Sequence, residues 1–329
     1  MTRALSKSAL CAAALTLCAS APPVSAQESA RALPAVTAHS YAPTSSRSLP
    51  IFYDNALAGQ GFPNPLVKAR IAGHEAIFIV DTGASVNVLA DWYVEVAGIL
   101  ANARFDSTAQ GSGGKATAER LAHRLQGHWS DGQRFVLNEA AVVAFPPLFK
   151  SLHLGGLVSP QLLAPAGMAA VLDLRIPSLQ FVPFTHALSD LRRSKAPTVP
   201  IDLTQACRNA DSKLANRQYL APVTTAGVTD LVLVDTGATK TIFSNESKIS
   251  HAIESRSELG PPSEGVGGEV NGRRIVRDVQ LLRGGRIVVL NPSIGEVSAP
   301  CDAKGILGMD ALRSCLLILG DNEMAFSCR

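Results

Sequence analysis

The sequence is organised by a six-residue phrase that occurs twice. Val-Asp-Thr-Gly-Ala-Ser spans residues 80–85, and Val-Asp-Thr-Gly-Ala-Thr spans residues 234–239, 154 residues further along the chain. Each copy directly follows a short apolar run, Ala-Ile-Phe-Ile-Val or Leu-Val-Leu-Val, of the kind that forms a buried β-strand. The chain must therefore fold so that the same polar loop appears twice, each time at the end of a buried strand.

Other short motifs recur around this phrase in the same order and at nearly the same offset. An Ala-Gly pair precedes each copy, where a hairpin turn would join two strands. Two pairs of Gly-containing segments follow: Gly-Ser-Gly-Gly at 111–114 with Gly-Val-Gly-Gly at 265–268, and Gly-Leu-Val-Ser-Pro-Gln-Leu-Leu at 156–163 with Gly-Ile-Leu-Gly-Met-Asp-Ala-Leu at 305–312. Matches in this order indicate an internal duplication.

The duplication predicts an all-β chain of two lobes related by a pseudo-twofold axis. The first lobe would span residues 48–184 and the second 198–329, with the polar, Pro-containing segment 185–197 as a linker. The 26 Gly and 20 Pro residues suit many short strands and turns. Short helices are expected as well, one of them within residues 89–99, whose apolar positions have helical spacing.

The N-terminal residues have the pattern of a signal peptide over residues 1–26. Arg3 and Lys7 supply the positive region, residues 9–21 are apolar, and a small-x-small sequence ends at Ala26. An uncleaved anchor is the alternative, but the apolar run is too short to span a bilayer. We therefore expect a periplasmic or secreted protein that is cut after Ala26 and has no membrane span.

Two further features complete the expectations for the start of the chain. Lipoprotein processing at Cys18 is disfavoured because the bulky Leu17 stands where a small residue is required. Residues 27–47 are rich in Ala, Ser, Pro and Thr and are predicted to be a flexible leader. The formal net charge is only +3 and no basic block occurs, so nothing supports a nucleic-acid partner.

Export would place the cysteines in an oxidising compartment, where disulfides form. Residues 315–328 are predicted to form a hairpin around a two-residue Asp-Asn turn, which sets Cys315 opposite Cys328 in a non-hydrogen-bonded pair. This register predicts a Cys315–Cys328 disulfide, and Cys207–Cys301 follows by elimination. The alternative is four free thiols.

The repeated Asp residues suggest a specific chemistry. One Asp-Thr-Gly alone would be read as a turn after a strand. Two copies related by a twofold axis would bring two carboxyl groups together, and such a pair shares one proton because both groups cannot ionise cheaply. One carboxylate can then accept a proton from water while the other carboxyl group donates one to a peptide carbonyl.

These motifs resemble the retropepsin-like aspartic proteases. The resemblance is to a bacterial, exported type in which two lobes follow one another in a single chain. Aspartic proteases are the established example of a carboxyl pair that shares one proton. The resemblance implies that Asp81 and Asp235 are the catalytic pair. It also implies that Thr82 and Thr236 donate hydroxyl bonds across the interface, and that Gly83 and Gly237 let the chain turn and offer backbone to the substrate.

The resemblance gives the Gly-rich segments a role as flaps that close over a bound peptide. Taken alone, these segments could equally be plain hairpin turns. The flap residues would be Gly111, Ser112, Gly113 and Gly114 in the first half, and Gly265, Val266, Gly267 and Gly268 in the second.

The sequence departs from the family pattern in two places. Ser159 stands where the second half has Gly308, a position that normally packs beneath the active-site loop, so the first half is expected to be looser. Ala84 and Ala238 stand where pepsin-like enzymes have Ser. Without that hydroxyl the carboxyl pair should be less acidic, which predicts an activity optimum at mildly acidic pH.

Other reaction types find no support in the sequence. No His-Glu-x-x-His or zinc-like His spacing occurs, and neither Gly-rich segment has the Lys-Ser/Thr of a phosphate loop. Ser112 does not lie in a nucleophile elbow, and Cys207 has no His partner in the sequence. A glycosidase would need its two carboxyl groups apart, across a sugar ring.

The sequence thus predicts an exported, single-chain aspartic endopeptidase that needs no metal or cofactor. It should act as a monomer and bind peptide as an added, extended strand. Two alternatives stay open: a non-catalytic peptide-binding protein that retains the protease scaffold, and a two-lobe unit that acts only within a larger envelope assembly.

Overall fold

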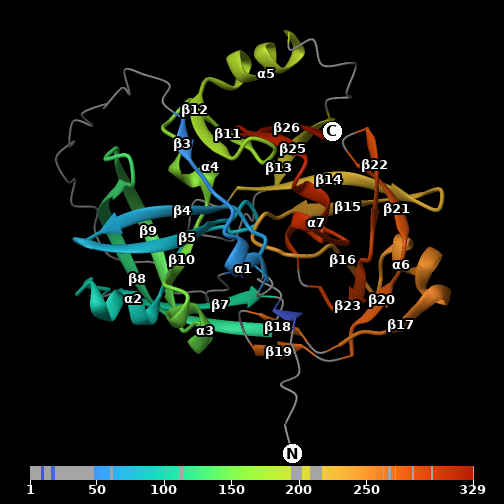
Figure 1. Cartoon of the computed structure of the whole chain (residues 1–329), viewed down its shortest axis with the longest axis horizontal. Coiled ribbons are helices and arrows are strands. Elements are labelled where there is room, and N and C mark those ends of the chain that lie inside the picture. The colour runs from blue at the N-terminus through green and yellow to red at the C-terminus, as the bar shows by residue number, and fades with distance from the viewer. Residues whose placement is uncertain are drawn as a thin grey trace, which may run out of the picture.

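The computed structural model is mostly β-strand with short helices, which confirms the all-β prediction (Figure 1). Within the described residues no helix is long and apolar enough to cross a membrane. The structure describes residues 9–10, 16–18, 48–59, 62–101, 103–111, 114–193, 202–207, 217–261, 263–265, 268–270, 272–283, 285–297 and 299–328.

The first half of the chain forms a closed, barrel-like sheet. Its strands follow the order β7-β8-β4-β5-β10-β6-β9, and β9 returns to pair with β8. The strands are β4 (Leu66–Ile71), β5 (His74–Val80), β6 (Asn87–Ala90), β7 (Ala103–Gly111), β8 (Gly114–Trp129), β9 (Arg134–Val143) and β10 (Leu154–Val158). The helices are α1 (Asn55–Gly59), α2 (Asp91–Val96), α3 (Pro147–Ser151) and α4 (Pro160–Leu163).

The second half repeats the central part of this arrangement with shorter strands. The order β23-β16-β24-β15-β14 corresponds to the strands around β5 in the first half. The strands are β14 (Gln218–Thr225), β15 (Val228–Val234), β16 (Ile242–Ser244), β17 (Ser257–Leu259), β18 (Ser263–Gly265), β19 (Gly268–Val270), β20 (Arg274–Val276), β21 (Val279–Arg283), β22 (Arg286–Leu290), β23 (Ser293–Gly295) and β24 (Gly305–Leu307). The helices are α6 (Lys248–Ile253), η1 (Glu254–Arg256), η2 (Pro300–Asp302) and α7 (Met309–Leu312).

Each half presents its repeated phrase at the end of a hairpin. The hairpins β4–β5 and β14–β15 turn at Ala72-Gly73 and Ala226-Gly227, and all four residues have positive φ. Positive φ at both turn residues matches the right-handed twist of the flanking strands. The second strand of each hairpin also pairs in parallel with β10 or β24. The repeated loops therefore emerge from the buried middle of each sheet.

The closing strands of the two halves pair with each other, which the sequence did not predict. A shared sheet with the order β3-β12-β11-β25-β26-β13 lies between the halves, at the top of Figure 1. Its central pair is antiparallel β11–β25, in which Ala170 lies opposite Leu319. Pairing removes two free sheet edges at once. The strands are β3 (Leu49–Pro50), β11 (Ala169–Asp173), β12 (Ser178–Val182), β13 (Asp202–Cys207), β25 (Cys315–Leu319) and β26 (Glu323–Cys328).

The segment expected as a linker is largely helical. Helix α5 (Phe184–Arg193) lies over the shared sheet (Figure 1). Its apolar residues Phe184, Ala187, Leu188 and Leu191 follow the i, i+3, i+4, i+7 spacing of one helix face and contact Ile318 and its apolar neighbours. The polar character of the segment belongs to the opposite face of this helix.

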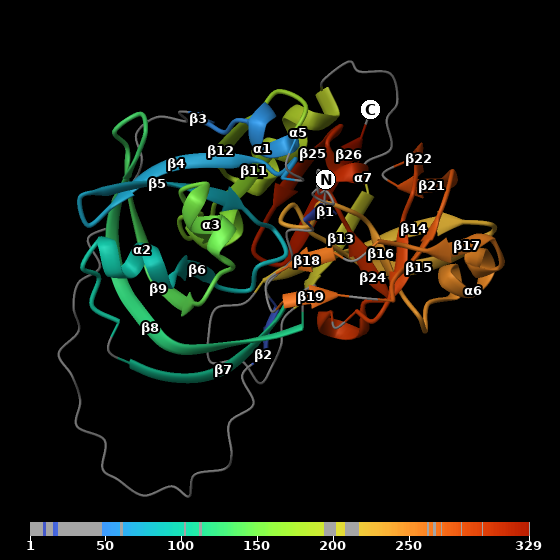
Figure 2. The same cartoon turned by 60° about the horizontal axis from the view of Figure 1, so that its bottom comes forward.

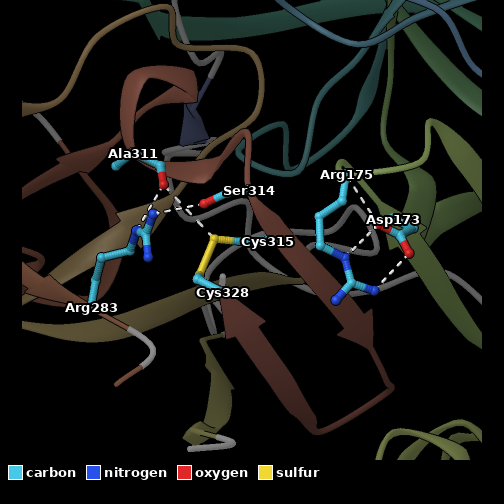
Figure 3. Close-up of a disulfide and its surroundings, with 7 residues drawn as sticks. All are labelled: Asp173, Arg175, Arg283, Ala311, Ser314, Cys315 and Cys328. Atoms are coloured by element: carbon cyan, nitrogen blue, oxygen red, sulfur yellow. Dashed lines mark hydrogen bonds and ion pairs between the residues drawn. A yellow bond between two sulfur atoms is a disulfide. The ribbon is translucent and has the colours of Figure 1, made fainter. Parts of the chain in front are cut away.

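Two disulfides fasten the second half. Cys315 and Cys328 lie opposite each other on β25 and β26, with Cα atoms 4.0 Å apart, in the register of the predicted hairpin (Figure 3). The buried Arg283 lies nearby, and its Nε donates to the carbonyl oxygen of Ala311 at 2.7 Å. The second disulfide joins Cys207 on β13 to Cys301 in η2, with Cα atoms 6.2 Å apart.

Two short strands come from the expected signal peptide. Strand β1 (Ala9–Leu10) pairs in parallel with β18, and strand β2 (Thr16–Cys18) pairs antiparallel with β7. Both partners belong to the Gly-rich hairpins that were predicted to be flaps. The backbone edges of these hairpins thus accept extended chain.

Candidate active site

The two repeated loops meet between the halves of the chain. Asp81 directly follows β5 and Asp235 directly follows β15. Each Asp N–H donates to the last residue of the parallel neighbouring strand, Val158 at 2.9 Å and Leu307 at 3.1 Å. The parallel pairing therefore fixes where each Asp leaves its sheet.

The two threonines bind the loops to each other. The hydroxyl of Thr82 donates to the carbonyl oxygen of Val234 at 2.8 Å, and the hydroxyl of Thr236 donates to that of Val80 at 2.6 Å. Each hydroxyl also accepts the backbone N–H of the other threonine at 3.1 Å. The four bonds are reciprocal and fully buried, so neither loop can shift without the other.

The two glycines allow the loops to approach each other closely. A Cβ added to Gly83 would lie 2.5 Å from Cγ of Asp235, and one added to Gly237 would meet the carboxyl group of Asp81 in the same way. Unlike Gly73 and the other turn glycines, these two do not have positive φ. At both positions the structure shows a need for space for the opposite carboxyl group, and the expected contact of their backbone with substrate stays a prediction.

The two carboxyl groups are buried and each is held by its own loop. Asp81 and Asp235 are 0% exposed, and their Oδ2 atoms find no N–H or O–H donor among the described residues. Their Oδ1 atoms each accept two backbone N–H groups: those of Gly83 (2.8 Å) and Ala84 (3.0 Å) in the first loop, and those of Gly237 (2.8 Å) and Ala238 (3.1 Å) in the second.

Burial and mutual contact make the two carboxyl groups unequal. Desolvation raises the pKa of Asp81 to about 6, although contact with Asp235 and the backbone N–H groups oppose this rise. Desolvation, followed by the charge of Asp81, raises the pKa of Asp235 well above its usual range. Burial and mutual contact thus favour the protonated form of Asp235 more strongly than that of Asp81.

The Gly-rich segments form two hairpins that lie side by side. Strand β7 turns into β8 with Gly111 opposite Gly114, and β18 turns into β19 with Gly265 opposite Gly268. Strand β19 lies against β8 (Figure 2). The tip residues Ser112, Gly113, Val266 and Gly267 lie outside the described residues.

Ser159 and Gly308 occupy matched positions in the two halves, but the space around them differs. A Cβ on Gly308 would lie 2.5 Å from the backbone carbon of Lys240. Ser159 is fully buried, its N–H donates to Oδ1 of Asn87 at 2.9 Å, and its hydroxyl finds no partner among the described residues. The first half thus holds a buried hydroxyl that makes no hydrogen bond to any described residue, and the predicted looseness of this half stays a prediction.

Three buried amide side chains at the loops were missed from the sequence. Asn64, Gln161 and Gln218 donate to carbonyl oxygens of the two Asp-Thr-Gly loops. The available signal was positional, because Asn64 and Gln218 are separated by the same 154 residues as the two Asp residues. In the described part of the chain no cluster of His, Cys, Asp and Glu could hold a metal ion.

We expect opposite effects from substitutions at the two matched positions. Ser159→Ala removes a buried hydroxyl that has no partner in the described part of the chain, and it should raise the free energy of unfolding by about 1 kcal/mol. Gly308→Ala places a Cβ against the Lys240 backbone and should lower it by about 2 kcal/mol or more. Urea unfolding measures both, and equal effects at the two sites would contradict this description of their packing.

The buried carboxyl pair should also make the fold less stable as the pH rises. Both folded-state pKa values are raised, so the native chain binds more protons than the unfolded chain above pH 4, and stability falls with pH. For Asp81 alone the raised pKa corresponds to about 3 kcal/mol lost between pH 4 and pH 7.

Asp235→Asn should remove part of the stability that the fold loses as the pH rises. The new amide can donate to the Asp81 carboxylate, so the variant should be more stable than the wild type at pH 8. Asp230→Asn is the control, since the Asp230 carboxylate is buried but accepts the N–H of Ile249 away from the pair. Urea unfolding at pH 5 and pH 8 would reject the idea if Asp235→Asn kept the wild-type slope.

One comparison with known proteins covers the first loop of this site. Residues 67–156 match a family model described as aspartyl protease, and the match includes Asp81, Thr82 and Gly83. No curated protein matches the chain. The matched segment covers less than a third of the chain and contains only the first of the two repeated Asp-Thr-Gly loops.

Proposed function

We propose that the protein is an exported aspartic endopeptidase in which Asp81 and Asp235 activate one water molecule between them. The observation that supports this most strongly is the contact of two fully buried carboxyl groups, each fixed by two N–H donors. A pair of this kind holds one proton, as general acid–base catalysis by two carboxyl groups requires.

The unequal pKa values assign a role to each carboxyl group. Asp81, as the carboxylate, accepts a proton from water while the water oxygen bonds to the carbonyl carbon of the peptide. Asp235, as the acid, donates its proton to the carbonyl oxygen, and a tetrahedral diol results. The Asp81 proton then passes to the amide nitrogen, the C–N bond breaks, and one diol hydroxyl returns a proton to Asp235. One water molecule is consumed.

The Gly-rich hairpins are the proposed contact for the peptide backbone. Residues 9–10 and 16–18 of the chain already pair with β18 and β7, so the edges of both hairpins accept an extended strand. Because both carboxyl groups are buried, segments that cover them must move before peptide and water can enter. The hairpins β7–β8 and β18–β19 are the proposed moving parts.

The proposed enzyme needs only one chain. Both carboxyl groups, and the threonine bonds that hold their loops, lie within a single chain. We therefore propose that the monomer is active, with pseudo-twofold lobes at 48–184 and 198–329. Removal of residues 1–26 on export is part of the proposal, and the two disulfides suit an oxidising compartment.

The direct test is cleavage of a peptide library by purified protein. Asp81→Ala and Asp235→Ala should each lower kcat by about 10³-fold or more, because each removes one partner of the shared proton. Asp230→Asn changes a buried carboxyl group on β15, the strand that Asp235 follows, and this variant should retain activity.

A result in which either Ala variant keeps wild-type activity would contradict the mechanism. If the wild type cleaves nothing at any pH but binds peptide, the protein is a peptide-binding protein with a protease scaffold.

The pH dependence of kcat/KM should be bell-shaped. On the acid side, activity rises as Asp81 loses its proton, at a pH near its pKa of about 6. On the alkaline side, activity falls as Asp235 loses the shared proton at higher pH. Initial rates with one peptide between pH 3 and pH 10 test this, and a maximum well below pH 6 would contradict it.

A further inference from the structure

We propose that Asn64 and Gln218 are positioning residues. Through them, each half of the chain donates hydrogen bonds to carbonyl oxygens of the Asp-Thr-Gly loop of the other half. The kinetic consequences of this inference rest on the proposed function. The hydrogen bonds from which it is argued do not depend on that function. It adds a second set of contacts between the halves, beyond the threonine hydroxyls.

Asn64 holds the second loop. It lies just before β4 in the first half, it is 0% exposed, and its Nδ2 donates to the carbonyl oxygens of Thr236 at 2.8 Å and Gly237 at 2.9 Å. Carbonyl oxygens only accept hydrogen bonds, so the amide nitrogen must face them. One side chain thus satisfies two successive carbonyl groups of the opposite half.

Gln218 holds the first loop in return. It begins β14, it is buried, and its Nε2 donates to the carbonyl oxygen of Gly83. The neighbouring carbonyl group, that of Thr82, accepts from Nε2 of Gln161 at 3.0 Å. The first loop therefore needs two Gln side chains for the contacts that Asn64 alone provides to the second loop.

The peptide groups that these amides hold are the same ones that hold the carboxylates. In the second loop, the Thr236–Gly237 and Gly237–Ala238 peptide groups accept from Asn64 through their oxygens and donate to Oδ1 of Asp235 through their N–H groups. Each peptide group thus lies between an amide and a carboxylate. Hydrogen bonds in such a chain polarise one another, which strengthens the N–H donors that face the carboxylate.

The amide oxygens of two of these side chains carry a cost to stability. Oδ1 of Asn64 and Oε1 of Gln161 are buried and find no donor among the described residues. An unsatisfied buried acceptor of this kind is unfavourable. An apolar side chain would remove the unpaired acceptor but would leave the loop carbonyl groups without these donors, so the useful property of the amides is their N–H groups, which point at the loops.

Replacing Gln218 and Asn64 by Leu should shift opposite sides of the pH profile of kcat/KM. Without its amide partner, each loop donates more weakly to its carboxylate, and the pKa of that Asp rises. Gln218→Leu should shift the acid side of the kcat/KM profile upward by about half a pH unit, through Asp81. Asn64→Leu should shift the alkaline side upward by about one unit, through Asp235, because it loses two contacts.

The expected kinetic effect falls on kcat. We expect Asn64→Leu to lower kcat by about 30-fold and Gln218→Leu by about 5-fold, with KM changed less than about 3-fold. Tyr93→Phe is the control for lost stability, because the Tyr93 hydroxyl is buried and donates to the carbonyl oxygen of His74 at 2.7 Å, remote from the loops. This control should lower Tm without moving either side of the profile.

The pKa values of the Asp carboxyl groups can also be read without activity. Titration of ¹³C-labelled Asp in the wild type and both variants measures them directly. If the wild type cleaves no peptide but the variants shift these titrations, the positioning role stands and the proposed protease function fails. The positioning role would be overturned if both variants had the wild-type kcat, the wild-type pH profile and the wild-type Asp titrations. Should Asn64→Leu not fold, Asn64→Ala and Gln218→Ala give the same readings.

Discussion

The structure depends on keeping two carboxyl groups in contact where water does not reach them. Burial of an unpaired charge is costly, so every neighbouring group must either donate to the pair or leave room for it. The backbone N–H groups of each loop donate to Oδ1, the threonine hydroxyls join the loops, and Gly83 and Gly237 leave the space that the opposite carboxyl groups occupy. The same burial that destabilises the pair as the pH rises also raises the pKa of both carboxyl groups, and the proposed chemistry depends on this rise.

The rest of the fold serves to hold the loops against each other. Parallel pairing of β5 with β10, and of β15 with β24, fixes the point at which each Asp leaves its sheet. The shared sheet around β11 and β25 joins the two halves, and the main apolar core contains residues from both. The hairpins β7–β8 and β18–β19 contribute extended edges at which a peptide could pair. In the proposed mechanism the sheets and the Asp-Thr-Gly loops stay rigid, and the hairpins β7–β8 and β18–β19 move.

Local patterns in the sequence predicted what each half does by itself. The apolar runs before the repeated phrase gave the buried strands, the Ala-Gly pairs gave the hairpin turns, and the two-residue turn gave the register in which Cys315 and Cys328 meet. The matched offset also identified Asp81 and Asp235, which the structure brings together. The contacts between halves were not predictable in this way. The pairing of β11 with β25 and the amide of Asn64 depend on segments that are more than a hundred residues apart in sequence, and an isolated buried Asn has no local signature. The α5 face was visible as an i, i+3, i+4, i+7 pattern, but its charged residues and nearby Pro suggested a linker.

The central claim is that Asp81 and Asp235 share one proton. Neutron diffraction from deuterated crystals at pH 7 would locate that proton directly. The account predicts one deuteron between the two carboxyl groups, with Oδ1 of each Asp facing the N–D groups of its own loop. Two deuterons, none, or carboxyl groups that have moved apart would contradict it.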